Sequence, residues 1–349
     1  MKKMQQKASL ASMSLWTLSR VFQFGGIFLL LSALIWGFSQ PAAADGSLPL
    51  PWGWACSNTS VYAFIACKHE AKDDYWIARG NCRNISDRES RRDCMAEAKD
   101  SLPEAIQECR DQFWARLEVC DAIGEAPYDP LPEIDQNDFV LPGNITAANA
   151  NPYFPLVRGY KWTYHTKEGD EITETTTDEV LKVTREIMGV QCVVVHDVVY
   201  DGDSTDPEDV KEDTYDWYAQ DKEGNVWYFG EFSLDYEEEL PSMEGSWIFG
   251  LEGAKPGIIM PADPVKGDVY RQEFSLGDAE DMAEILGVGV SPGSEVQGFE
   301  CAGTCVKTRD YSPIEPDVVE YKFYKNGVGV VLERNPDTGE RVELVDTNF

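Results

Sequence analysis

Six cysteines, the first at Cys56 and the last at Cys120, are spaced as a palindrome: C-x10-C-x14-C-x11-C-x14-C-x10-C. A chain that folds back near Arg88 brings the first cysteine opposite the sixth, the second opposite the fifth, and the third opposite the fourth. Cysteines 11 residues apart are about three helical turns apart and share one face of a helix. The spacing therefore predicts an antiparallel helical hairpin with nested disulfides, although six cysteines permit fifteen pairings. The predicted pairs are Cys56–Cys120, Cys67–Cys109 and Cys82–Cys94.

The residues around these cysteines favour helices. A first helix is expected over Ser57–Ala78, which carries apolar residues at intervals of three and four. A capping-box pattern at Ser86 predicts the start of a second helix that reaches about Lys99. A further capping box at Ser101, with a proline in the first turn, predicts that the helix restarts there and runs to about Ala122.

The first 44 residues have the features of an export signal. They carry basic but no acidic residues, an apolar run over Gly26–Phe38, and three alanines that end at Ala44. The apolar run is shorter than a comfortable membrane span, which needs about 20 residues; an uncleaved N-terminal anchor is the alternative. We expect a secreted or periplasmic protein whose mature chain has no transmembrane span and whose cysteines are oxidised.

The charge of the chain restricts its partners. Its formal net charge is −32, and it becomes −36 when the four basic residues of the signal are removed. Such a chain repels nucleic acid and anionic membranes, so neither is expected as a partner, whereas cations are plausible ones. A saline habitat would also account for this acidity. The partner itself cannot be deduced from the composition.

After the helical region the sequence pattern changes to that of strands. Residues 125–150 are rich in Pro, Asn and Asp and predict a linker, or a strap packed along the surface. Residues 151–349 alternate between apolar and polar positions, with several hairpin turns. One helix is expected within them, over Asp278–Leu286. The predicted fold class is α+β: a signal peptide over 1–44, a Cys-rich helical hairpin over 45–124, and a mostly antiparallel β domain that forms a curved sheet or half-barrel.

Several stretches of the β domain resemble a family of exported bacterial β-rich proteins with no established biochemical role. The matching stretches are Asn151–Tyr164, Asp216–Glu231, Gly253–Pro264, Tyr270–Phe274 and Asn326–Glu333. The resemblance implies export and a β-rich fold, and it implies no active site. The succession of strands is also similar to the lipoprotein-carrier fold of the LolA kind, a likeness of fold alone.

An acidic loop is the candidate metal site. Five oxygen-bearing residues fall at positions 1, 3, 5, 9 and 12 of a frame like that of an EF-hand: Asp201, Asp203, Thr205, Asp209 and Glu212. Position 6 is Asp206 where the motif needs glycine, and the flanks predict strands instead of helices. The alternatives are a loose Ca²⁺-binding hairpin loop and a solvated acidic loop. Calcium is the single candidate cofactor.

Aromatic residues and three further cysteines complete the candidate features. Trp217, Trp227 and Phe229 belong to one predicted hairpin, and their face would line a ligand cavity or form ordinary core. Cys301 and Cys305 are expected to pair, which leaves Cys192 free and buried. The alternative joins Cys192 to one of them across the sheet.

The sequence lacks the motifs of nucleophilic, phosphate-binding and zinc-dependent enzymes. The leading hypothesis is therefore an exported acidic protein with a binding or structural role, without catalysis, and with calcium as a candidate ligand. Two alternatives remain. One is an extracellular hydrolase that uses two carboxylates in a cleft lined by Trp217 or Trp227, and the other is a periplasmic carrier of a lipophilic ligand.

Overall fold

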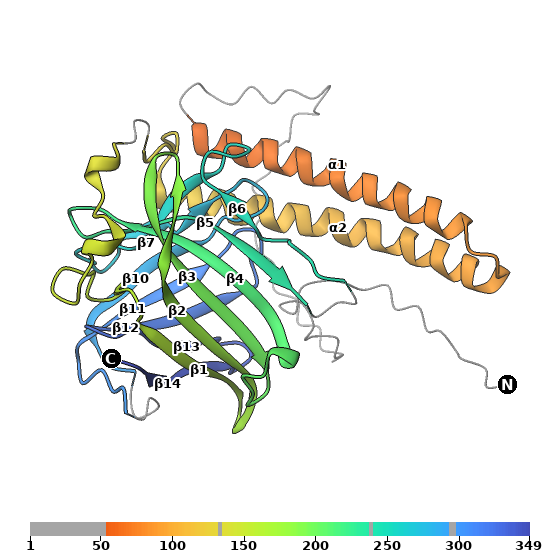
Figure 1. Cartoon of the computed structure of the whole chain (residues 1–349). Coiled ribbons are helices and arrows are strands. Elements are labelled where there is room, and N and C mark those ends of the chain that lie inside the picture. The colour runs from red at the N-terminus through yellow and green to blue at the C-terminus, as the bar shows by residue number, and fades with distance from the viewer. Residues whose placement is uncertain (1–53, 132–134, 237–239, 293–297) are drawn as a thin grey trace, which may run out of the picture. The chain divides into compact units, whose positions relative to one another are not determined.

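The computed structural model describes residues 54–131, 135–236, 240–292 and 298–349. Its first elements are two long helices, α1 (Ala55–Arg83) and α2 (Arg88–Ile123). Figure 1 shows them side by side and antiparallel. The expected signal peptide lies outside the described residues.

Disulfides hold the two helices together in the predicted register. Cys56 is bonded to Cys120 and Cys67 to Cys109, and Cys82–Cys94 joins the helices next to the turn. The buried residues of α1 are small or are cysteines: Cys56, Ser60, Ala63, Ala71 and Cys82. Side chains of this size bury little apolar surface. A hairpin of this kind therefore depends on its covalent links for stability.

Two details of the helical prediction are wrong. The second helix begins after Asp87, whose side chain accepts a hydrogen bond from the Ser90 backbone at 2.7 Å, and not at a capping box on Ser86. The helix also continues through Pro103 without the expected restart. Proline removes one helical hydrogen bond, but the disulfides on either side of it fix α2 against α1.

The strands that the structure describes between Lys161 and Thr347 form one antiparallel sheet that is nearly closed and barrel-like, as Figure 1 shows. Its strands follow the order β8-β10-β11-β12-β13-β14-β1-β2-β3-β4-β5-β7-β9, and β6 pairs with β5. The strands are β1 (Lys161–Glu168), β2 (Glu171–Ile187), β3 (Val190–Asp201), β4 (Val210–Gln220), β5 (Val226–Asp235), β6 (Trp247–Ile248), β7 (Lys255–Met260), β8 (Val269–Arg271), β9 (Glu273–Phe274), β10 (Met282–Val290), β11 (Cys305–Tyr311), β12 (Val319–Lys325), β13 (Gly329–Arg334) and β14 (Arg341–Thr347).

The two edges of the sheet meet because they are consecutive in the chain. Strand β8 lies at one edge and β9 at the other, and only Gln272 separates them. At this corner β7 passes so close that a Cβ on Gly257 would lie 2.2 Å from the carbonyl carbon of Gln272. Glycine at position 257 therefore permits the sheet to close.

The prediction of a helix over Asp278–Leu286 is wrong. This segment contributes to β10, which pairs with β8 on one side and with β11 on the other. Met282 and Ile285 are fully buried there. Helix propensities differ among these residues by only a few tenths of a kcal/mol, so two hydrogen-bonded ladders outweigh them.

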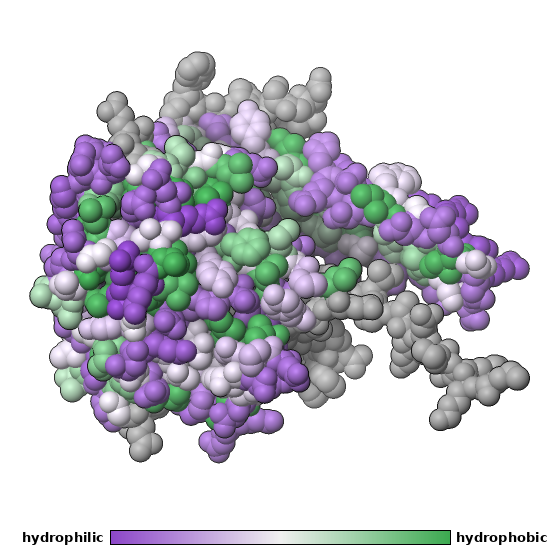
Figure 2. Space-filling view, in the orientation of Figure 1, coloured by the Kyte–Doolittle hydropathy of each residue, from purple (hydrophilic) through white to green (hydrophobic). Residues whose placement is uncertain are grey.

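Two apolar clusters lie on opposite faces of the sheet. The enclosed face carries a large cluster that includes Trp162, Tyr218 and Leu332. The other face carries a smaller cluster around Trp217 and Phe229, which we call the outer cluster. Figure 2 shows that hydrophilic residues cover much of the visible surface and that apolar residues form separate patches between them.

The segment 125–150 packs as a strap. Its Phe139 belongs to the outer cluster, and its Val140 backbone donates to the Gln220 carbonyl at 2.9 Å. Tyr128 donates its hydroxyl to the Pro256 carbonyl of β7 at 2.9 Å. The strap therefore ties the end of α2 to the sheet.

Candidate functional site

A pocket of about 550 Å³ lies where the base of the helical hairpin meets the sheet. We call it the junction pocket. It lies between the first turns of α1, the end of α2, the beginning of the strap, and strands β5, β7, β8 and β9. Much of its lining is apolar or aromatic, and includes Ile123, Pro127, Tyr128, Trp227, Ile258 and Phe274.

The sequence positions the base of the hairpin through one disulfide and one carboxylate. Cys56–Cys120 links the first turn of α1 to the last turns of α2. Gly124 then adopts a positive φ of 87°, which turns the chain out of the helix. Glu125 accepts hydrogen bonds from the Ser57 backbone, at 2.9 Å, and from the Ser57 hydroxyl. An acidic side chain at a helix N-terminus is stabilised by the unpaired N–H groups and the helix dipole.

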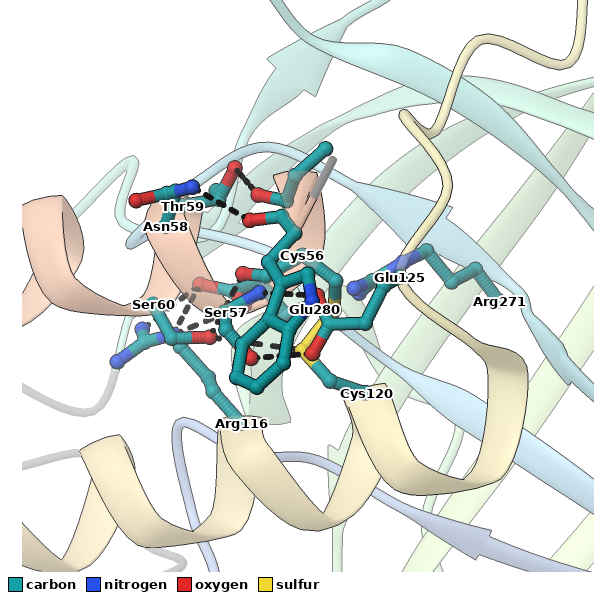
Figure 3. Close-up of a disulfide and its surroundings, with 12 residues drawn as sticks. Cys56, Ser57, Asn58, Thr59, Ser60, Arg116, Cys120, Glu125, Arg271 and Glu280 are labelled. Atoms are coloured by element: carbon teal, nitrogen blue, oxygen red, sulfur yellow. Dashed lines mark hydrogen bonds and ion pairs between the residues drawn. A yellow bond between two sulfur atoms is a disulfide. The ribbon is translucent and has the colours of Figure 1, made fainter. Parts of the chain in front are cut away.

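A buried ion pair joins α2 to the turn between β9 and β10, beside this disulfide, as Figure 3 shows. The Arg116 Nε lies 3.0 Å from both carboxylate oxygens of Glu280, and its Nη2 lies 2.7 Å from Oε1. Glu280 also accepts from the Gly277 backbone at 2.9 Å. The side chains of Arg116 and Glu280 are only 5% and 1% exposed. Loss of one partner would leave the other charge buried and unpaired, which typically costs about 3–5 kcal/mol.

A second arginine enters the pocket wall from β8. Arg271 is 8% exposed and lies over the rings of Phe274 and Tyr128, with its guanidinium carbon 4.6 and 5.4 Å from their centroids. Its Nη1 contacts the Met282 sulfur at 3.8 Å. Burial lowers the pKa of Arg271, and the nearby Glu280 carboxylate opposes this shift. The pocket therefore combines an apolar wall with buried positive charge.

The enclosed face of the sheet holds a separate set of acidic side chains, from strands that are neighbours in the sheet. Asp178 lies directly opposite Asp197, and Asp216 lies directly opposite Glu231. Burial raises the pKa of Asp178 and of Asp216 to about 7, and it raises the pKa of Asp197 well above its usual value. We call these four residues the inner carboxyl cluster.

Further around this face one lysine lies among three carboxylates. The Lys322 Nζ is 3.3 Å from Glu333, 3.6 Å from Glu320 and 3.9 Å from Asp310. Burial lowers the Lys322 pKa, but the three carboxylates outweigh it and raise the pKa well above its usual value. Neither acidic set could be predicted from the sequence, because alternation along a strand does not tell which of its two faces is enclosed.

The structure does not bring the candidate calcium ligands together around one point. Asp203, Thr205 and Asp209 are exposed, and Asp209 accepts from the Ser204 hydroxyl at 2.7 Å. Glu212 accepts instead from Thr214 at 2.7 Å, along β4. Within the ranges that the structure describes, no group of three or more Asp, Glu, His or Cys side chains is arranged to hold a metal ion. Calcium binding by this loop stays a prediction.

The three aromatic residues predicted to form a ligand face lie in two places: two are buried in the outer cluster, and the third also lines the junction pocket. Trp217 and Phe229 are buried in the outer cluster, where Arg185 lies 3.8 Å from the Trp217 ring. Trp227 packs beside them and donates its indole N–H to Asp221 at 2.9 Å, and it also lines the junction pocket. Cys301 is bonded to Cys305, and Cys192 is a buried free cysteine.

Comparisons with known proteins show that this chain has only distant similarity to those it matches. No family model matches the chain, and no curated protein matches it. The chain is similar to a Bacteroides fragilis protein inferred to be exported, with a YmcC-like fold: 14% identity, TM-score 0.33, over 57% of this chain and 100% of that one. It is also similar to an inferred lipoprotein of Parabacteroides distasonis: 11% identity, TM-score 0.31, over 57% and 99% of the two chains. Among the described residues, no helix is both long and apolar enough to cross a membrane.

Proposed function

We propose that the protein is an exported, non-catalytic binding protein that holds a lipophilic molecule in the junction pocket. Export is supported by the signal-like sequence of residues 1–44 and by the disulfides, which persist in oxidising compartments. N-terminal sequencing of the mature protein is expected to begin at Asp45.

One observation carries the binding function: a cavity of about 550 Å³ with a largely apolar lining. Small-molecule sites commonly have volumes of about 300–1,000 Å³, predominantly hydrophobic walls and a few convergent polar groups. An apolar ligand in such a site gains about 25 cal/mol for each Å² of its surface removed from water. The arginines and Glu280 supply the convergent polar groups.

Filling the pocket tests this function. Ala126 is an exposed residue that lines the pocket, so Ala126→Trp places an indole at its rim with little effect on the core. We expect the neutral dye N-phenylnaphthylamine to fluoresce on binding to the wild type and to bind Ala126→Trp at least tenfold more weakly. Ala122→Trp is the matched control, because Ala122 is exposed on α2 outside the pocket lining. Equal binding by all three proteins, or no binding to the wild type, would contradict the proposal.

The hydrolase alternative has one observation in its favour, the inner carboxyl cluster, in which burial raises the pKa values of Asp178 and Asp216. The required tryptophans lie elsewhere. Trp217 directly follows Asp216 along β4, and because successive side chains of a strand point to opposite faces, Trp217 packs on the opposite face of the sheet. The lipophilic carrier therefore agrees better with the geometry.

Calcium association is a separate part of the proposal, and the acidic loop that ends at Glu212 is its candidate site. Millimolar Ca²⁺ is expected to raise the melting temperature of the native protein more than Mg²⁺ does. Equal melting temperatures with and without Ca²⁺ would remove calcium from the account.

A further inference from the structure

The charges in the wall of the junction pocket do not cancel. Two guanidinium groups, on Arg116 and Arg271, are buried around the single buried carboxylate of Glu280. The remaining charged lining residue, Lys255, is more exposed and lies 2.8 Å from Asp129. One positive charge is therefore left without a buried counter-charge, in surroundings that are largely apolar.

Two donors in this wall also lack acceptors. Arg116 Nη1 and Arg271 Nε are buried, and neither has a hydrogen-bond partner in the part of the chain that the structure describes. Both side chains are more than nine-tenths buried and both line the pocket. A buried donor without an acceptor is costly, and it costs more when it carries charge. These two nitrogens have no exposed surface, so it is the uncompensated charge of the wall that an anionic group in the pocket would balance.

We propose that the ligand of the junction pocket is an amphiphile with one carboxylate, which Arg271 binds, and with an apolar chain that lies along Trp227 and Ile258. This inference rests on the proposed function, since it assigns the headgroup of the lipophilic ligand. Charge-assisted hydrogen bonds from guanidinium to carboxylate are about twice as strong as neutral ones.

A carboxylate suits this site better than a phosphate monoester. A carboxylate carries one negative charge, which equals the uncompensated charge of the wall, whereas a phosphate monoester carries about −1.5 to −2 at neutral pH. The planar guanidinium fork also matches the flat carboxylate, and Arg116 already binds the Glu280 carboxylate through two of its nitrogens.

The charge of the whole chain makes this local positive site unusual. A net charge of −32 repels anions at long range. Salt screens charges separated by more than about 10 Å at 0.1 M ionic strength, but it screens buried contacts much less. Added salt should therefore speed the association of an anionic amphiphile, whereas it would leave the association of a neutral one unchanged.

Titration calorimetry with dodecanoate and dodecanol tests the headgroup, because these ligands share one chain length and differ in charge. We expect the wild type to bind dodecanoate at least tenfold more tightly than dodecanol at about pH 7.5. Arg271→Gln should weaken dodecanoate binding about ten- to a hundredfold and leave dodecanol unchanged. Arg309→Gln, which removes an arginine outside the pocket, should bind both ligands as the wild type does.

The outcomes separate the inference from the function on which it depends. Equal wild-type affinity for the two ligands would overturn the carboxylate assignment and leave a lipophilic site standing. Binding of neither ligand would contradict both the carboxylate assignment and the proposed binding function. If Arg271→Gln fails to fold, as judged by its circular dichroism, the wild-type comparison and its salt dependence still decide the question.

Discussion

The inner carboxyl cluster is expected to make the protein less stable as the pH rises, because its buried carboxyl groups have raised pKa values. Asp216 is buried, lies opposite Glu231 and accepts a hydrogen bond from the Tyr228 hydroxyl at 2.6 Å. Burial raises its pKa from 3.8 to about 7. The folded protein therefore holds this proton more tightly than the unfolded chain does. The stability that this bound proton confers is fully present below about pH 4 and is lost as the pH rises through about 7.

The size of this effect follows from the shift. A rise of about three pKa units corresponds to about 4 kcal/mol between the protonated and ionised folded states, because each unit is worth about 1.36 kcal/mol. Asp216→Asn keeps the shape of the side chain and an oxygen that can accept from Tyr228, but it cannot ionise. We expect the variant to resemble the wild type at or below about pH 4, to be more stable by about 1.5 kcal/mol near pH 5, and to be more stable by up to about 4 kcal/mol near pH 8.

Urea denaturation, followed by tryptophan fluorescence between about pH 4 and pH 8.5, measures this difference. Asp263→Asn is the control, because Asp263 is exposed in a loop and its substitution changes the net charge by the same amount. We expect the control to follow the wild-type curve. Wild-type stability that is constant or rises with pH would refute the reasoning, as would an Asp216→Asn curve parallel to that of the wild type.

Two further substitutions test the architecture. Gly257→Ala should lower the free energy of unfolding by at least about 1–3 kcal/mol, because its Cβ would meet the Gln272 backbone; urea denaturation measures this, and Gly80→Ala in open space on α1 should not destabilise. Equal stability of the Gly257 and Gly80 variants would contradict our account of the sheet corner. Replacement of Cys67 and Cys109 by serine should cost about 2–5 kcal/mol and expose the hairpin to proteases, and unchanged proteolysis would show that the helices do not depend on this bridge.

The helical hairpin could be predicted from the sequence because its information is local and periodic. Equal spacings on the two sides of Arg88 and the helical repeat both favour the observed register. The antiparallel β domain could be predicted for a similar reason, since turns interrupt its alternating segments. The helix expected over Asp278–Leu286 failed because propensity is weak where two neighbouring strands compete for the same residues.

The junction pocket could not be predicted because its charged residues come from distant parts of the chain. Arg116 and Glu280 are separated by 164 positions, and the fold alone brings them together. One signal was present. Cys109, Gln112, Arg116 and Cys120 recur at helical spacing, so the arginine had to share the cysteine face of its helix, and all four are buried. An arginine on a disulfide-bonded face indicates a buried partner, although it does not identify one.

The most direct test of the account is a crystal structure of the protein with a dodecanoate that carries bromine at the end of its chain. Anomalous scattering locates the bromine without reference to the protein. The account predicts bromine density beside Trp227 and Ile258, and a carboxylate within hydrogen-bonding distance of Arg271. Bromine density elsewhere in the molecule, with the junction pocket holding only water, would contradict it.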